Sequence, residues 1–539
     1  MQIPDRLNTR IPTASILIAV YLVSVFILFH LAGPPFFYPM DDTYIHTATA
    51  RTLATTGVWG VSPASPAAAS SSPLWTVLLA GAWLTSPRAW FVGLPLALNL
   101  LAGCALILLL VGMFREKAAA LALAAVIFCA AALPSVSMLG MEHLLHAFCA
   151  LLLGLAGCRA LADPDENSDF KTLAWIALLS AAADAVRYES LFLVAPLAAL
   201  AALRRRWPLV LAFGLGAATP VLGFGLLWIH NGGWLLPNSL LLKTDVTKAG
   251  GMASSLAAIA ARSMKNLHSV NFIGEFSAMI IGVVAFLYFY WKKFRQVWDV
   301  PLLFGLCAVA ATAAHLAFAS VGWLVRYEAW LIVLDLSALF LLAERLLAPR
   351  ALFLLAALVA ALFAARVVDA TARTVLSIDD RRVQHLAPAL FVKANYPGET
   401  IMVNDIGAVA WFAPQSQALD VFGLGDNEPL RLSFSPGGYD SAALRDWALR
   451  ANARIAILEV CWKAISRLVP DEWRLVASWR IPRNVVFGEH VIGFFATSPD
   501  EDVKLDRAMA QFPLPEGVAL KMRPSRAAMK DGCYDDPAR

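Results

Sequence analysis

Residues Thr13–Gly33 read TASILIAVYLVSVFILFHLAG and contain no Asp, Glu, Lys or Arg. Such a run is long enough to cross a hydrocarbon core of about 30 Å as a helix. It is too long for a cleaved signal peptide and lacks a small-residue cleavage site, so we expect an uncleaved helix. Similar runs recur through the first two thirds of the 539 residues, and the chain is 59% hydrophobic and only 15% charged. A soluble protein carries about 25% charged residues, so the sequence predicts a polytopic α-helical membrane protein.

About eleven segments are expected to span the membrane. They lie near residues 13–33, 90–113, 117–134, 144–162, 171–185, 189–203, 208–230, 271–291, 300–320, 328–346 and 350–368. The apolar segment 73–84 is too short to cross, and we expect an interfacial helix there.

The positions of Lys and Arg in short loops predict the orientation, because cytoplasmic loops are enriched in them. With Arg6 and Arg10 inside, the inner loops hold most of the loop basic residues: Arg115, Lys117, Arg159, Lys171, Arg204, Arg205, Arg206, Lys292, Lys293, Arg295, Arg345 and Arg350. The N-terminus is therefore expected to be cytoplasmic. The expected location of the protein is the inner (plasma) membrane.

The same threading places three longer segments outside: the first loop (34–89), residues 231–270, and the polar part after the last span. We expect two domains, a membrane domain at 1–369 and an extracytoplasmic (periplasmic or extracellular) α/β domain at 370–539. In the second, segments 400–403, 418–422 and 454–460 are strand-like, and a turn at 404–407 leads into a helix. It has no glycine-rich nucleotide-binding motif. Cys461 and Cys533 are its only cysteines and are able to pair if the domain lies outside.

Unusual polar clusters all fall at the predicted outer surface. They are Asp41, Asp42, Tyr44 and His46; Glu142 and His143; Asp184, Arg187, Tyr188 and Glu189; Asn238 and Lys243; and Arg326, Tyr327 and Glu328. Ionisable groups at membrane depth are costly and usually face a cavity or a partner, so these clusters predict a shared polar cavity.

Asp41 and Asp42 are the strongest candidates for chemistry. One Asp suffices to cap a helix start, whereas two adjacent carboxylates repel each other. If a helix starts here, Asp42 and His46 share one face and Asp41 points elsewhere. The pattern leaves open which of the two acts.

The other candidates have ordinary structural alternatives. Glu142 and Glu189 fit ion pairs, Arg187 and Arg326 fit headgroup contacts, and the tyrosines fit an interfacial belt. His46 and His143 are more often hydrogen-bonding residues than metal ligands.

A cavity of this kind is compatible with glycosyl transfer, although it does not point to that reaction alone. The outer face has no supply of nucleotide sugars, so a transferase there needs a donor such as a polyprenyl-phosphate sugar. Its phosphate leaving group suits arginines, its hydroxyl acceptor needs a carboxylate base, and its tail needs an apolar groove. The expected partners are this donor, a glycan or glycoconjugate acceptor and membrane lipid. No basic tract is interleaved with aromatics, which argues against nucleic acid.

Several short motifs in the sequence resemble those of a known family. The run from Pro39 to His46, followed by Ala50-Arg51, Gly57-Val-Trp and Ser70-Ser-Ser-Pro73-Leu-Trp75, is similar to the first outer loop of GT-C fold glycosyltransferases. Among these it most resembles the arabinofuranosyltransferase-like group of mycobacterial arabinan synthesis. Later pieces match in order: Leu139-Gly-Met-Glu142, Arg187-Tyr-Glu189, Leu236-Pro-Asn238-Ser with Lys243, Val325-Arg-Tyr327, Val403-Asn-Asp-Ile-Gly407 and Leu419-Asp-Val-Phe-Gly423.

The resemblance implies a polyprenyl-phosphate donor, a catalytic base at Asp41 or Asp42, and a C-terminal domain that helps to hold the acceptor. It implies that Glu142 and Glu189 line the site and that Arg187 and Arg326 meet the donor phosphate. The sequence departs from the group at His143, where a small polar residue is usual. Some GT-C enzymes use a divalent metal held by acidic residues, and a metal is possible here.

Two other functions remain open from the residues alone. A transporter or flippase of a lipid-linked precursor would share the apolar groove and the buried charges. Such proteins usually show internal repeats and broken helices at mid-membrane, neither of which the sequence shows. A membrane scaffold without catalysis would leave the acidic pair unexplained.

Overall fold

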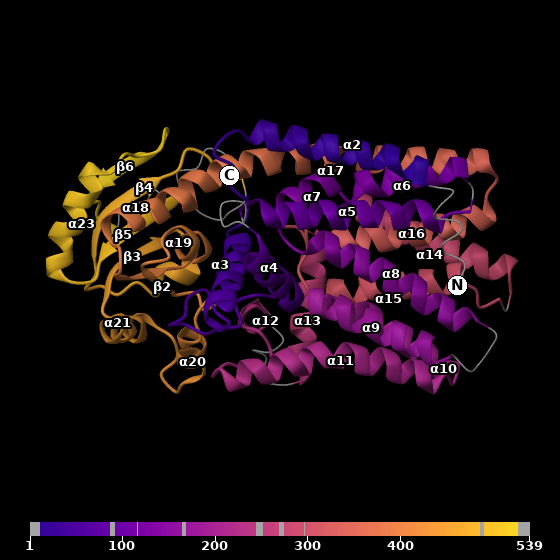
Figure 1. The fold of residues 1–539 in the computed structure, drawn as a ribbon, viewed down its shortest axis with the longest axis horizontal. Helices are drawn as coiled ribbons and strands as arrows, with labels where there is room; N and C mark the ends of the chain where they lie inside the picture. The colour runs from indigo at the N-terminus through magenta and orange to yellow at the C-terminus, as the bar shows by residue number, and fades with distance from the viewer. Residues whose placement is uncertain are drawn as a thin grey trace.

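The computed structural model describes residues 11–86, 92–115, 117–163, 169–243, 252–268, 274–295, 297–485 and 490–526. Its long helices run side by side, and a sheet-containing domain sits at one end of this bundle (Figure 1). The predicted inner residues Arg6 and Arg10, and Cys533, lie outside the described part of the chain.

A helix lies at each of the eleven apolar runs. These helices are α2 (Ile11–Ala32), α5 (Leu94–Met113), α6 (Lys117–Ala130), α8 (His143–Ala162), α9 (Phe170–Val186), α10 (Leu191–Leu203), α11 (Trp207–His230), α14 (Glu275–Lys293), α15 (Val300–Phe318), α16 (Ala329–Leu346) and α17 (Pro349–Arg381). Seven helices in the described part are long and apolar enough to cross a membrane: α2, α5, α8, α11, α14, α15 and α17. The chain is a multi-pass membrane protein, and the total of eleven spans stays a prediction.

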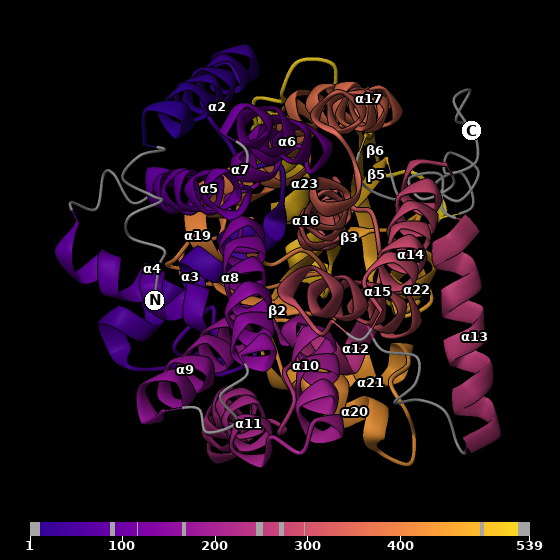
Figure 2. The ribbon, with the colours of Figure 1, turned by 90° about the vertical axis from the view of Figure 1, so that its right-hand side faces the viewer.

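The burial of the helices follows their sequences. Every side chain from Ala329 to Ala343 of α16 is buried, and α16 lies in the middle of the bundle (Figure 2). Apart from Asp335 and Ser337, these buried residues are apolar, as in a helix that lies in a core. The peripheral helix α2 instead exposes Ile16, Phe26 and Leu31. In a membrane protein such exposed apolar side chains face lipid.

Shorter helices gather at the end of the bundle that meets the sheet domain. They are α3 (Asp41–Thr56), α4 (Pro73–Thr85), α7 (Leu133–Met138), the 3-10 turn η2 (Tyr188–Ser190), α12 (Asn238–Lys243) and α13 (Met252–His268). Helix α3 begins at Asp41 and is capped after Thr56 by Gly57, whose N–H bonds to the carbonyl of Leu53 and whose backbone is left-handed (φ 74°). Helix α4 occupies the short apolar segment that the sequence assigns to the interface.

No break separates the membrane helices from the C-terminal domain. Helix α17 runs through residue 370 and continues as a π-helical turn η4 (Arg382–Leu386) and α18 (Ala387–Asn395). The sheet that follows consists of β1 (Thr400–Val403), β2 (Gln417–Asp420), β3 (Ala453–Glu459), β4 (Arg474–Arg480), β5 (Val491–Ala496) and β6 (Ala519–Met522), in the order β2-β1-β3-β5-β4-β6. The helices beside it are α19 (Gly407–Phe412), α20 (Glu428–Phe434), α21 (Ser441–Arg450), α22 (Lys463–Ser466) and α23 (Pro499–Gln511). The predicted strands at 400–403, 418–422 and 454–460 are confirmed as β1 to β3.

The two faces of the sheet contribute to different cores, because side chains alternate along a strand. Ile401 and Val403 of β1 join the core that extends into the membrane helices. Met402 joins a second core with Leu444 and Trp447 of α21. The sheet is therefore packed continuously onto the membrane domain through one face.

The first outer loop and the C-terminal domain are also joined by polar contacts. The Arg51 guanidinium donates to the carbonyls of Ala410 and Trp411 at 2.7 and 3.2 Å. The Ser65 hydroxyl donates to the Asp426 carboxylate at 2.6 Å. Within the domain, Cys461 is disulfide-bonded. The first outer loop and the C-terminal domain are thus held together at this end of the molecule.

Candidate active site

The predicted polar clusters converge where the membrane helices meet the C-terminal domain. Helix α3 supplies Asp42 and His46, the junction of α9 and α10 supplies Arg187 and Glu189, and the turn before α16 supplies Arg326. All of them line one cavity of about 250 Å³. The sequence-based prediction of a shared polar cavity therefore matches the placement of these residues.

Asp41 and Asp42 have different environments. The Asp41 carboxylate is buried and accepts hydrogen bonds from the backbone N–H groups of Gly407 and Ala408, at 2.7 and 2.8 Å. These N–H groups begin α19, where a helix N-terminus favours negative charge. Burial nevertheless raises the pKa of Asp41 to about 6. Asp41 thus joins the first loop to the C-terminal domain.

Gly407 makes this contact sterically possible. A Cβ atom at this position would overlap the Asp41 carbonyl oxygen and would lie 2.8 Å from the Ile45 nitrogen. Only glycine lets the start of α19 approach the first turn of α3 this closely.

Asp41 lines only the larger of the two cavities at this site, whereas Asp42 lines both. The Asp42 side chain is 24% exposed, and its Oδ2 accepts a hydrogen bond from Arg326 Nη2 at 2.8 Å. Asp42 lines the cavity described above and also a second one of about 760 Å³. His46 lines the first cavity as well, as expected for residues four apart on one helical face.

The two cavities differ in their walls. The smaller one is bounded by many apolar side chains, among them Ile45, Leu191, Phe192, Leu240 and Phe318, and we call it the apolar cavity. The larger one lies against the C-terminal domain and is bounded by Asn404, Asp405, Phe422, Glu459 and Trp462, and we call it the interdomain cavity. Six residues line both: Asp42, Arg262, Ser320, Arg326, Tyr327 and Leu424.

Arg187 is the centre of a buried ion-pair network. It donates to Glu142 at 2.5 Å and, through two nitrogens, to Glu189 at 2.5 and 3.1 Å. The other Glu142 oxygen lies 3.6 Å from His46 Nε2. Burial lowers the pKa of His46, so the ring is neutral at pH 7. Two carboxylates pair with the single positive charge of Arg187, so the guanidinium is fully engaged and acts as a fixed part of the cavity wall.

Arg326 is held from several sides. Besides Asp42, its guanidinium donates to the Tyr327 hydroxyl at 2.9 Å and to the Met141 sulfur at 2.7 Å. The residues just before it, Trp323 to Val325, all have left-handed backbone with φ of 56–57°. This conformation costs about 1–3 kcal/mol per residue and concentrates at functional sites.

The remaining predicted site residues lie around the cavities in supporting positions. Tyr44 stacks on Phe37 with ring centroids 4.5 Å apart, and it is not among the residues that line either cavity. His143 is buried and meets the Tyr327 ring edge-on. The Asn238 amide donates to the carbonyls of Gly423 and Asp426, so it holds a loop of the C-terminal domain. The Lys243 side chain lies outside the described part of the chain.

Two basic residues of α13 were missed by the sequence reasoning. Arg262 lines both cavities, and Lys265 lines the interdomain cavity. The Arg262 guanidinium donates to the Ser320 hydroxyl at 3.2 Å. A usable signal was the segment 252–268, which alternates apolar and polar residues at helical spacing inside an otherwise irregular outer segment.

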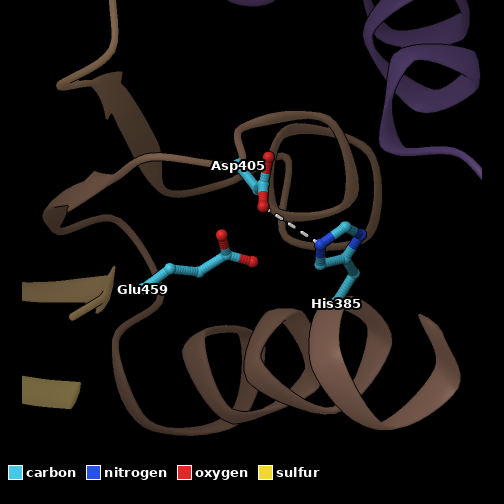
Figure 3. Close-up of side chains that lie close together, drawn as sticks. All are labelled: His385, Asp405 and Glu459. Carbon is cyan, nitrogen blue, oxygen red and sulfur yellow. Dashed lines mark hydrogen bonds and ion pairs between the residues drawn. The ribbon is translucent and has the colours of Figure 1, made fainter. Parts of the chain in front are cut away.

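One cluster has the residue types of a metal site. His385 of η4, Asp405 after β1 and Glu459 at the end of β3 point toward one another (Figure 3), and one ligand atom from each lies within 4.8 Å of the others. However, His385 Nε2 accepts a hydrogen bond from Arg381 Nη1 at 2.9 Å and lies 3.2 Å from Asp405. The guanidinium thus places a positive charge beside His385 and uses the lone pair of Nε2, which could otherwise bind a metal ion. The cluster therefore fits a metal in composition but not in its surroundings.

Solved membrane-protein structures share this architecture. The chain is similar to the crystal structure of ArnT from Cupriavidus metallidurans bound to undecaprenyl phosphate, with a TM-score of 0.53 and 14% identity over 90% of this chain and 98% of that chain. The apo form of the same protein gives a TM-score of 0.51 and 13% identity over 90% and 99%. This chain has the GT-C fold. The archaeal oligosaccharyltransferase from Archaeoglobus fulgidus, tethered to an acceptor peptide, is more distant, with a TM-score of 0.46 and 11% identity over 95% of this chain and 76% of that one.

At the level of sequence, residues 376–498 match a domain of unknown function, DUF8728. No curated protein matches the chain. This matched segment contains β1 to β5 of the sheet and the residues of the C-terminal domain that line the interdomain cavity. The fold class expected from the sequence, a GT-C-like membrane protein with a C-terminal α/β domain, is thus confirmed.

Proposed function

We propose that this GT-C fold protein is a glycosyltransferase that moves a sugar from a polyprenyl-phosphate donor to a hydroxyl of an extracytoplasmic glycan or glycoconjugate. The observation that carries the proposal is the position of Asp42 and Arg326, a carboxylate and a guanidinium in contact at the junction of two cavities. A transferase needs a base on the acceptor side and a cation on the donor side of one reacting carbon.

The apolar cavity suits the donor. Leu191, Phe192 and Phe318 offer surface to a prenyl chain, and Arg326 and Arg262 offer charge-assisted hydrogen bonds to a phosphate. One of the ArnT structures with this fold was solved with undecaprenyl phosphate bound. The carrier lipid is therefore the partner that we expect in this cavity.

The interdomain cavity suits the acceptor. Its aromatic walls at Phe422, Trp462 and Trp323 and its carboxylates at Asp405 and Glu459 match the apolar faces and hydroxyl groups of a saccharide. The hydrogen bonds that the backbone N–H groups of α19 donate to the Asp41 carboxylate fix this wall to the first loop.

In the proposed reaction, Asp42 removes the proton from the acceptor hydroxyl while its oxygen attacks the anomeric carbon of the donor. The bond from that carbon to the phosphate oxygen breaks, and the polyprenyl phosphate leaves with the electron pair. As Asp42 becomes neutral, the Arg326 charge loses its counter-ion and becomes available to the phosphate, on which negative charge develops. The Arg326 guanidinium thus exchanges its partner, from the Asp42 carboxylate to the leaving phosphate.

Two separate features support the proposed orientation of the protein in the membrane. The described arginines at the far end of the bundle fit a cytoplasmic face, and the disulfide at Cys461 fits an oxidising compartment for the C-terminal domain. The inner membrane is the location that we propose, with the C-terminal domain periplasmic or extracellular. The resemblance to the arabinofuranosyltransferase-like group makes a pentose the first sugar to test.

The experiment uses the purified full-length protein with a panel of polyprenyl-phosphate sugars, beginning with arabinofuranose, and an extract of cell-envelope glycans as acceptor. Transfer of labelled sugar to the glycan, with release of an equal amount of polyprenyl phosphate, is the expected result. Movement of the intact donor across proteoliposome membranes without release of the phosphate would instead support the flippase alternative.

A further inference from the structure

A second charged cavity lies at the end of the bundle away from the C-terminal domain. It has a volume of about 680 Å³ and is bounded by the ends of α5, α8, α10 and α16 and by the turn before α15. Four arginines from four separate segments line it: Arg115, Arg159, Arg204 and Arg345. We call it the arginine cavity.

The charge of its lining is unbalanced. Two carboxylates, Asp299 and Glu344, face four guanidinium groups. Both carboxylates also accept hydrogen bonds from neutral donors: Asp299 from the Tyr290 hydroxyl, and Glu344 from the Arg115 backbone N–H at 2.6 Å. The lining therefore keeps an excess of positive charge around a space large enough for a ligand.

Ordinary roles explain part of this arrangement. Basic residues in the last turn of a helix interact favourably with its dipole, and Arg204 donates to the carbonyl of Leu161 at 2.5 Å, near the end of α8. Cytoplasmic loops are also rich in arginine. Neither role requires four guanidinium groups to converge on one cavity, and the two carboxylates of its lining offset only half of their charge.

The apolar part of the lining indicates the kind of anion. Met113, Leu155 and Leu341 form its inner wall, while Val297 and Trp298 are exposed at its edge. Tryptophan beside apolar side chains at a helix end is typical of the headgroup level of a membrane. Basic pockets between membrane helices on the cytoplasmic side bind anionic headgroups. We propose that the arginine cavity binds the phosphate headgroup of an anionic phospholipid, with the first part of its acyl chains on the apolar wall.

The test measures binding to purified full-length protein in neutral detergent. Phosphatidylglycerol and phosphatidylcholine are titrated while the unfolding temperature and the bound lipid (native mass spectrometry) are recorded. We expect selective binding of phosphatidylglycerol, and a loss of about tenfold or more in affinity for the double variant Arg159→Gln, Arg345→Gln, because charge-assisted bonds to phosphate are removed. The matched control is Arg205→Gln, Arg350→Gln, which removes the same charge from exposed residues of the same end that do not line the cavity.

Equal affinity of the cavity variant and the control would overturn the proposal. Glycerol 3-phosphate and inorganic phosphate form the second arm, and competition by either at the affinity of the lipid would show a soluble phosphate ligand, which would also contradict it. If the double variant does not fold, each single substitution is compared with its single control under the same criterion. No sugar transfer enters this test, so its result is independent of the proposed reaction.

Discussion

Asp42 Oδ2 accepts a hydrogen bond of 2.8 Å from Arg326 Nη2, and the two side chains together stand where the apolar cavity meets the interdomain cavity. They come from segments separated by 284 positions in the chain. The proposed reaction uses both: the carboxylate as base, and the guanidinium as its counter-ion and then as a ligand of the leaving phosphate.

Replacing Arg326 by Lys tests the second half of this relationship. Lysine keeps the charge but loses the planar donors that reach Asp42 and Tyr327 together. We expect kcat for transfer to fall by about 10- to 100-fold, since one or two charge-assisted bonds of about 1.5–3 kcal/mol each are weakened in the transition state. Steady-state kinetics measures this. A rise in KM with unchanged kcat would mean that Arg326 binds the substrate equally in the ground state and the transition state, which would contradict this role.

Gly407→Ala tests the junction of the two domains. The added methyl group would overlap the Asp41 carbonyl oxygen, so the contact between α19 and α3 must open. We expect the free energy of unfolding to fall by about 1–3 kcal/mol, as for other overpacked sites. Gly437→Ala is the control, because no atom lies within 4 Å of the position that its methyl group would take and its φ is not in the left-handed region. Equal thermal unfolding of the two variants would contradict the close approach.

His46 is expected to make the stability of the protein depend on pH. Burial lowers its pKa in the folded state from the ordinary 6.5, so below that pH the unfolded chain binds a proton that the folded chain does not. The folded state is therefore destabilised as pH falls below 6.5. We expect His46→Gln to reduce this loss, measured as the difference in unfolding temperature between pH 7.5 and pH 5. An unchanged pH slope would mean that His46 titrates normally.

Removal of divalent metal is expected to leave transfer intact. Guanidinium groups supply the positive charge beside the apolar cavity. In the cluster of His385, Asp405 and Glu459, the Arg381 guanidinium already donates to His385 Nε2. Dialysis against a chelator followed by the transfer assay checks this. Loss of transfer that Mn²⁺ or Mg²⁺ restores would show that the cluster of three holds a catalytic metal after all.

Features that depend on short stretches of sequence, such as the positions of helices and strands, could be predicted best. Apolar length placed a helix at each of the eleven expected positions, and β1 to β3 were found by their composition. Strands β4 to β6 were missed; in β4, Arg474 and Arg480 flank the buried Val476 and Trp479, so its apolar signal is short.

The distinction between Asp41 and Asp42 shows where sequence reasoning ends. Helical spacing predicts that Asp42 and His46 share a face, and both line the apolar cavity, whereas Asp41 lines only the interdomain cavity. What Asp41 meets depends on Gly407, which lies 366 positions later and reaches α3 only because the C-terminal domain docks there. For the same reason Arg262 was missed, since the position of α13 over the cavities is a tertiary property.

The most direct test compares Asp42→Asn with Asp41→Asn in the transfer assay with a polyprenyl-phosphate sugar, alongside thermal unfolding of both. Asp42→Asn is expected to fold, with a smaller fall in unfolding temperature than Asp41→Asn because Asp42 is partly exposed. It is expected to lose transfer by about a hundredfold or more, as removal of a general base does. Asp41→Asn is expected to lower the unfolding temperature, because an amide cannot accept both N–H bonds of α19, while the folded fraction keeps measurable transfer. Wild-type transfer by Asp42→Asn, or its complete loss only in Asp41→Asn, would contradict the assignment of Asp42 as the base.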